Sequence, residues 1–110
     1  MVQRAGTVAT GAALLLALAA TASAGEISSQ RAGQLNYLVL EDCGSCHGMT
    51  LKGGLGKPLR PADLEDLEIE TIATVILEGV PGTPMPAWRG LLTEDEAAWI
   101  AAALKLGLIK

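Results

Sequence analysis

Apolar residues recur at helical spacing in three segments of the chain, and no segment alternates between apolar and polar positions as a strand does. The first segment begins near Ser29, a favourable N-cap residue, and runs into a pair of cysteines. The second covers residues 68–78 and the third begins after Thr93. The pattern predicts an all-α fold of three to four helices. The apolar stripes consist of Ala32, Leu35, Tyr37, Leu38 and Val39, then Ile69, Ile72, Ala73, Val75, Ile76 and Leu77, and finally Trp99, Ile100, Ala103 and Leu104.

The ends of these helices are marked by capping residues. Thr93 and Glu96 form a capping box at the start of the last helix, and Gly79 and Gly107 are placed to end the second and third helices. Residues 48–61 contain four glycines and two prolines, which indicates a loop. Gly33 lies inside the first helix, and we expect another helix to cross closely there.

The first two dozen residues are typical of an export signal. Arg4 gives a positive start, residues 11–20 are apolar, and the sequence Ala-Ser-Ala at 22–24 matches a cleavage site. We therefore expect residues 1–24 to be cleaved, leaving residues 25–110 as one domain in the periplasm without a membrane span. A retained membrane anchor is the alternative if cleavage does not occur.

Composition limits both the core and the partners. The chain has no phenylalanine, so its own side chains form a thin core. Cleavage would remove Arg4 from the 8 Lys and Arg while all 12 Asp and Glu remain, so the net charge would change from −4 to −5. Such an acidic chain is not expected to bind nucleic acid, because phosphate contacts need basic residues.

Both cysteines and the single histidine fall within the five residues Cys43-Gly-Ser-Cys46-His47. This C-x-x-C-H spacing is that of a covalent c-type haem site, in which the two thiols bond the porphyrin and the histidine ligates the iron. We expect one haem per chain. A redox-active dithiol, a structural zinc site and a short disulfide are the alternatives. A redox dithiol would need a βαβ pattern around the motif, and none is visible. A structural zinc site needs four nitrogen or sulfur ligands, and the cysteines and histidine of this chain supply three. A disulfide between the two cysteines would close too short a loop to add much stability.

Met85 is the candidate for the second axial ligand. It lies between Pro84 and Pro86, which stiffen the backbone around a weak thioether ligand. The alternatives are that Met85 only packs the loop, or that it dissociates and makes the protein a haem sensor. For the other nitrogen of His47 we expect the carbonyl of Pro58 as hydrogen-bond acceptor.

Four basic residues lie in the two loops expected to flank the haem. Arg60 and Arg89, together with Trp88, are candidate donors to the haem propionates. With Lys52 and Lys57, the two arginines are also expected to form a positive rim that steers a partner.

The whole of residues 25–110 resembles the class I cytochromes c, in helix order, haem motif and methionine loop. More narrowly, residues 42–56 (DCGSCHGMTLKGGLG) and 80–92 (VPGTPMPAWRGLL) are similar to small periplasmic cytochromes of the c-55X type, associated with cytochrome cd1 nitrite reductase in denitrifying bacteria. The resemblance implies the class I cytochrome c fold and a role in nitrite respiration.

The resulting expectation is a monomeric one-electron carrier with His47 and Met85 as axial ligands, and not an enzyme. Its partner would be cytochrome cd1 nitrite reductase. The alternative is a maturation or docking factor that works with the proteins of haem d1 assembly.

Overall fold

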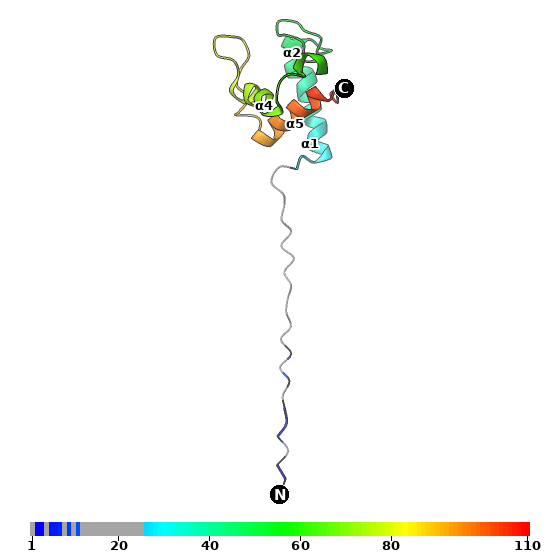
Figure 1. Cartoon of the computed structure of the whole chain (residues 1–110), viewed down its shortest axis with the longest axis vertical. Coiled ribbons are helices and arrows are strands. Elements are labelled where there is room, and N and C mark those ends of the chain that lie inside the picture. The colour runs from blue at the N-terminus through cyan, green and yellow to red at the C-terminus, as the bar shows by residue number, and fades with distance from the viewer. Residues whose placement is uncertain (1, 4, 8, 10, 12–25) are drawn as a thin grey trace.

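A computed structural model describes residues 26–110 together with residues 2, 3, 5–7, 9 and 11. Helices are its only regular elements within this part of the chain, so the all-α prediction is confirmed. In chain order they are α1 (Ser29–Leu38), η1 (Val39–Cys43), α2 (Gly44–His47), α3 (Pro61–Leu64), α4 (Ile69–Glu78) and α5 (Glu94–Lys105), as Figure 1 shows. Most of the predicted signal segment, including the cleavage site after Ala24, lies outside the described residues. No described helix is long and apolar enough to cross a membrane.

The first predicted helix is built from α1, η1 and α2 without a break. Ser28 caps its start, because the Ser28 hydroxyl accepts a hydrogen bond from the Arg31 amide at 3.1 Å. In η1 the chain widens into a π-helical turn, and the Gly44 amide donates to the carbonyl of Val39, five residues earlier. Such turns are frequent at functional sites, and this one ends at Cys43.

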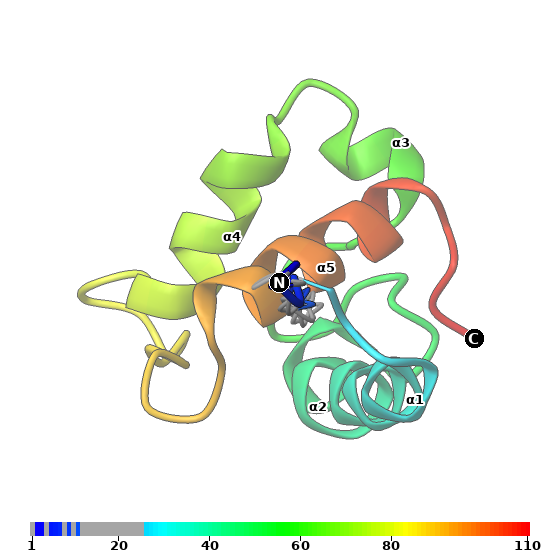
Figure 2. The same ribbon diagram turned by 90° about the horizontal axis from the view of Figure 1, so that it is seen from below.

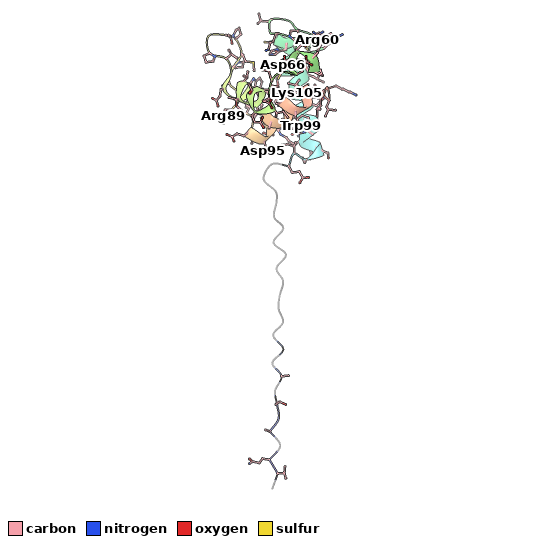
Figure 3. The ribbon with its side chains drawn as sticks, in the orientation of Figure 1. Arg60, Asp66, Arg89, Asp95, Trp99 and Lys105 are labelled. Atoms are coloured by element: carbon pink, nitrogen blue, oxygen red, sulfur yellow. The ribbon has the colours of Figure 1, made fainter. Side chains whose placement is uncertain are left out.

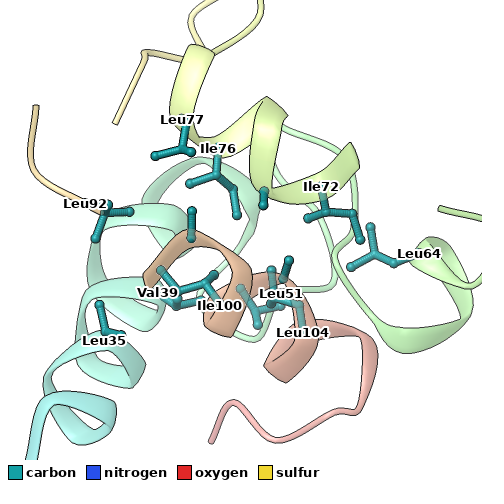
Figure 4. Packing of buried hydrophobic residues seen from close by; sticks show 13 residues of the cluster. Leu35, Val39, Leu51, Leu64, Ile72, Ile76, Leu77, Leu92, Ile100 and Leu104 are labelled. Carbon is teal, nitrogen blue, oxygen red and sulfur yellow. The ribbon is translucent and has the colours of Figure 1, made fainter. Parts of the chain in front are cut away.

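The C-terminal helix α5 lies at the centre of the domain, with α4 on one side and the α1–η1–α2 helix on the other (Figure 2). Its small buried residues Ala97 and Ala101 let the neighbouring helices approach closely. Figure 4 shows the side chains that meet there. They are Leu35 and Val39 from the first helix, Ile72, Ile76 and Leu77 from α4, and Ile100 and Leu104 from α5.

Gly33 does not mark the helix crossing, so that expectation is wrong. Gly33 is exposed, and a Cβ atom added there would meet nothing within 4 Å. The first helix instead meets α5 through Leu35, which is fully buried, and through Arg31. The contact between the first helix and α5 is therefore made by a large apolar side chain, Leu35, and by the Arg31–Glu96 ion pair, not by a glycine.

Arg31 and Glu96 form the polar part of this contact. The Arg31 guanidinium donates to Glu96, whose side chain also accepts a hydrogen bond from the Thr93 amide at 3.0 Å. The Thr93 hydroxyl in turn accepts from the Glu96 amide at 3.1 Å, which completes the predicted capping box. Glu96 is buried, and these bonds give its carboxylate both a charged and a neutral donor.

We expect Glu96 to make the stability of the protein depend on pH. Its pKa is lowered, first by the hydrogen bond from Arg31 and then by the backbone bond at Thr93. A lowered pKa means that this stabilisation is present above the pKa of the unfolded chain, about 4.3, and is lost as the pH falls through the folded value. Between about pH 6 and about pH 3, the melting temperature of the haem-loaded protein should therefore fall by a few degrees more in the parent than in Glu96→Gln. Asp95→Asn, in the same helical turn, should behave like the parent, and equal losses in all three proteins would contradict this role.

Candidate functional site

A cavity of about 630 Å³ opens between the helices, within the size range of small-molecule and cofactor sites. Its wall is mostly apolar and comes from the end of η1, from α2 and the loop after it, from the end of α3, from α4 and the loop after it, and from α5. Four of the predicted site residues lie in this wall together, namely Cys43, Cys46, His47 and Met85.

The two cysteines lie on consecutive turns of the helix that ends in α2, and no disulfide joins them. Burial, and then the neighbouring charge of Asp42, raise the pKa of the Cys43 thiol to about 11. Reactive dithiols show the opposite behaviour, a lowered pKa that keeps one sulfur as thiolate. Cys43 therefore lies in a site that favours its neutral, uncharged form.

His47, the last residue of α2, is held by a backbone carbonyl. Its Nδ1 lies 2.7 Å from the carbonyl oxygen of Lys57, not that of Pro58, so the predicted acceptor was wrong by one residue. A carbonyl oxygen can only accept, so Nδ1 carries the proton of the neutral ring and Nε2 keeps its lone pair. The ring is thus prepared to ligate a metal through Nε2.

The glycine-rich loop folds closely around α2 and supplies that carbonyl. The Gly56 amide donates to the Cys46 carbonyl at 2.7 Å, and the Gly53 amide donates to the His47 carbonyl at 2.8 Å. A Cβ atom on Gly56 would lie 2.7 Å from Nδ1 and Cε1 of His47. Glycine at 56 therefore leaves the space that the imidazole occupies, and the loop forms a cradle for the ring.

Met85 reaches the cavity from the loop between α4 and α5. It is half-buried in the cavity wall, and so is Trp88 three residues later. Trp88, a candidate donor to the haem propionates, therefore lies in the same cavity wall as Met85. Pro58 and the two arginines are not in the wall of this cavity.

The two arginines are occupied by carboxylates. Arg60 binds Asp63, with Nε and Oδ2 2.8 Å apart, and Arg89 binds Glu78 and Glu94. Figure 3 shows the arginines well apart, Arg60 at the upper right and Arg89 at the left of the domain. These contacts do not support the expected pairing of the two arginines with haem propionates. Their carboxylate partners also compensate two of the four positive charges of the expected rim.

Several apolar wall residues were not predicted as site residues. Leu55, Val75 and Val80 line the cavity although 78%, 41% and 40% of each is exposed. Exposed apolar side chains mark a binding surface when they gather in one place, as these three do in the wall of one cavity. For Val75 the signal in the sequence was the apolar stripe of the second helix, whereas Leu55 and Val80 lie in loops and carried no such signal.

The residues fit a c-type haem. Two thiols, an imidazole with one free nitrogen and a thioether surround one apolar cavity, which is the set of groups that attaches and ligates such a haem. The glycine cradle leaves room for the imidazole to take this position.

Comparison with known proteins supports the same conclusion. The family model described as "Cytochrome C oxidase, cbb3-type, subunit III" matches residues 30–102. A cytochrome c55X of Paracoccus denitrificans is 53% identical over 90 residues, which cover 82% of this chain and 87% of that protein. The solved structure of the c-type cytochrome NirC matches with a TM-score of 0.74 and 46% identity, over 76% of this chain and 98% of that one.

A larger protein contains a similar domain. Dihydro-heme d1 dehydrogenase of Pseudomonas aeruginosa is 36% identical over 94 residues, which cover 86% of this chain but only 18% of the dehydrogenase. The matches to cytochrome c55X and NirC, each over most of both chains, agree with the helix order and the cavity described above. This chain therefore belongs to the c-type cytochromes, as a small cytochrome of the c55X and NirC type.

Proposed function

We propose that this protein is a periplasmic, monomeric one-electron carrier with a c-type haem bound covalently through Cys43 and Cys46 and ligated by His47 and Met85. The observation that supports it most is that these four side chains line a single apolar cavity, although Met85 comes from a different loop far along the chain. The export signal read from residues 1–24 supports the periplasmic location.

Each residue has a definite task in this proposal. The thiols of Cys43 and Cys46 would each add across one vinyl group of the haem to form the two thioether bonds, and the Lys57 carbonyl fixes the tautomer and orientation of His47. The thioether of Met85 is a soft, weak ligand, and with histidine it favours the ferrous state and raises the reduction potential. The haem supplies the iron that changes oxidation state. The apolar wall keeps water away from it.

We infer that the electrons serve nitrite reduction and that cytochrome cd1 nitrite reductase is the acceptor. The basis is the similarity to cytochrome c55X and NirC. The similarity to part of dihydro-heme d1 dehydrogenase favours a second candidate, in which the protein works with the enzymes that complete haem d1.

Stopped-flow mixing separates the two candidates. The reduced protein should be oxidised by cytochrome cd1 nitrite reductase with a second-order rate constant of about 10⁵ M⁻¹s⁻¹ or more, the range of specific protein association. Oxidation by a small inorganic oxidant is the control, because it shows that the protein is competent for electron transfer. No transfer to the reductase would end the donor proposal. Fast reduction of the oxidised protein by dihydro-heme d1 dehydrogenase and its substrate would then support the second candidate.

A further inference from the structure

The loop that carries Met85, residues 79–90, is closed at its base by hydrogen bonds to the last turn of α4. The amides of Trp88 and Arg89 donate to the carbonyls of Ile76 and Leu77, each at 3.1 Å. Gly79 makes this approach possible, because a Cβ atom there would lie 2.7 Å from the Met85 carbonyl oxygen. The chain therefore leaves α4 and returns along it, with Met85 in between.

The interior of the loop is held by its own bonds. The Val80 amide donates to the Met85 carbonyl at 3.2 Å, and the Thr83 hydroxyl donates to the Val80 carbonyl at 2.7 Å. The same hydroxyl accepts from the Met85 amide at 3.3 Å. Because the interior is tied together, the loop is expected to open as a unit at its base.

Arg89 joins that base to two helices. Its Nε donates to Oε1 of Glu78 at 2.7 Å, and its Nη1 donates to Oε1 of Glu94 at 3.4 Å. Glu78 is the last residue of α4 and Glu94 is the first of α5, so one guanidinium links the ends of the two helices between which the loop lies. About half of each of the Arg89 and Glu78 side chains is exposed, 51% and 52%, so salt in the solvent screens this pair.

We propose that Arg89 is a positioning residue that holds the Met85 loop closed through Glu78 and Glu94, so that salt loosens the hold on Met85. This inference rests on the proposed ligation by Met85. This positioning role takes the place of the haem-propionate contact that the sequence suggested for Arg89.

Displacement of Met85 by imidazole in the ferric haem-loaded protein tests this role. The rate at saturating imidazole, followed through the long-wavelength ferric band, is limited by opening of the loop. It should be about two- to fivefold higher in Arg89→Gln and in Glu78→Gln at low salt, the size expected for an exposed ion pair. Raising salt from about 0.01 M to about 0.5 M should increase the parent rate towards that of Arg89→Gln and leave the Arg89→Gln rate nearly unchanged, because that variant has lost both ion pairs. The displacement rate of Arg89→Lys, which keeps the positive charge, should lie between those of the parent and Arg89→Gln.

Arg60→Gln is the matched control, because the Arg60 side chain is as exposed as that of Arg89, 52% against 51%, and its carboxylate partner Asp63 lies outside the loop. It should leave the rate and its salt dependence unchanged. A parent rate that does not respond to salt, or an Arg89→Gln rate equal to the parent rate, would overturn the proposal.

Hydrogen exchange separates failure of this inference from failure of the ligation. If the parent shows no long-wavelength ferric band, ligation by Met85 is wrong, but the loop base can still be measured. The amides of Trp88 and Arg89 should then exchange about two- to fivefold faster in Glu78→Gln than in the parent, and equal exchange would overturn the role of Arg89 independently.

Discussion

Replacement of both Cys43 and Cys46 by alanine is expected to leave the chain largely unfolded. Without its covalent cofactor the domain would have to keep a cavity of about 630 Å³. At about 24 cal/mol per Å³, leaving even half of this volume empty costs roughly 8 kcal/mol. This is comparable with the whole stability of a small domain, about 5–15 kcal/mol. Far-UV circular dichroism should show little helix and no cooperative melt.

The matched control is Ser45→Ala, which changes the exposed residue between the two cysteines and keeps both thiols. It should fold, bind haem and melt as the parent does. A native-like cooperative melt of the double cysteine variant would show that the protein side chains form a sufficient core without the cofactor.

The second large effect is expected from Met85→Ala. Loss of the thioether should abolish the long-wavelength ferric band and open the iron to small ligands. It should also lower the reduction potential by on the order of 0.1 V, within the roughly 0.8 V over which axial ligands set haem potentials. The loop itself should stay folded, because its base is held by backbone bonds from Trp88 and Arg89. Absorption spectroscopy and redox titration measure the two effects.

Met49→Ala is the control for this variant. Met49 is 59% exposed and lies outside the wall of the cavity, so its loss should change neither the band nor the potential. If the band survives in Met85→Ala, Met85 is not the ligand and the haem-sensor alternative returns.

The sequence was sufficient for those features that depend on local pattern. The helices followed from periodicity and from the capping box of Thr93 and Glu96. The spacing of Cys43, Cys46 and His47, and the proline neighbours of Met85, singled out four residues that the structure places in one cavity wall, and their roles in haem binding stay predictions. Each of these signals lies within a few residues of the feature that it predicts.

Features that depend on the path of the chain in space were predicted less well. The acceptor for His47 is the Lys57 carbonyl because the glycine-rich loop turns one residue earlier than we expected from Pro58. Arg89 finds Glu78 only because the loop returns along α4, and nothing in the local sequence marks that contact. Arg60 differs, since Asp63 follows it by three residues and could have been recognised as its partner.

The cavity wall could be predicted only in part for the same reason. The apolar stripe of α4 was visible in the sequence, but its division between α5 and the cavity depends on how the two helices pack. Ile76 is buried in the core and also lines the cavity, whereas the neighbouring Val75 lines the cavity and stays partly exposed.

Intact-mass spectrometry of the purified protein, made in cells that assemble c-type cytochromes, tests the covalent attachment of the haem. We expect a chain heavier by one haem, with no thiol left to react with an alkylating reagent, since both Cys43 and Cys46 are bonded. A chain of unmodified mass with two reactive thiols would contradict it.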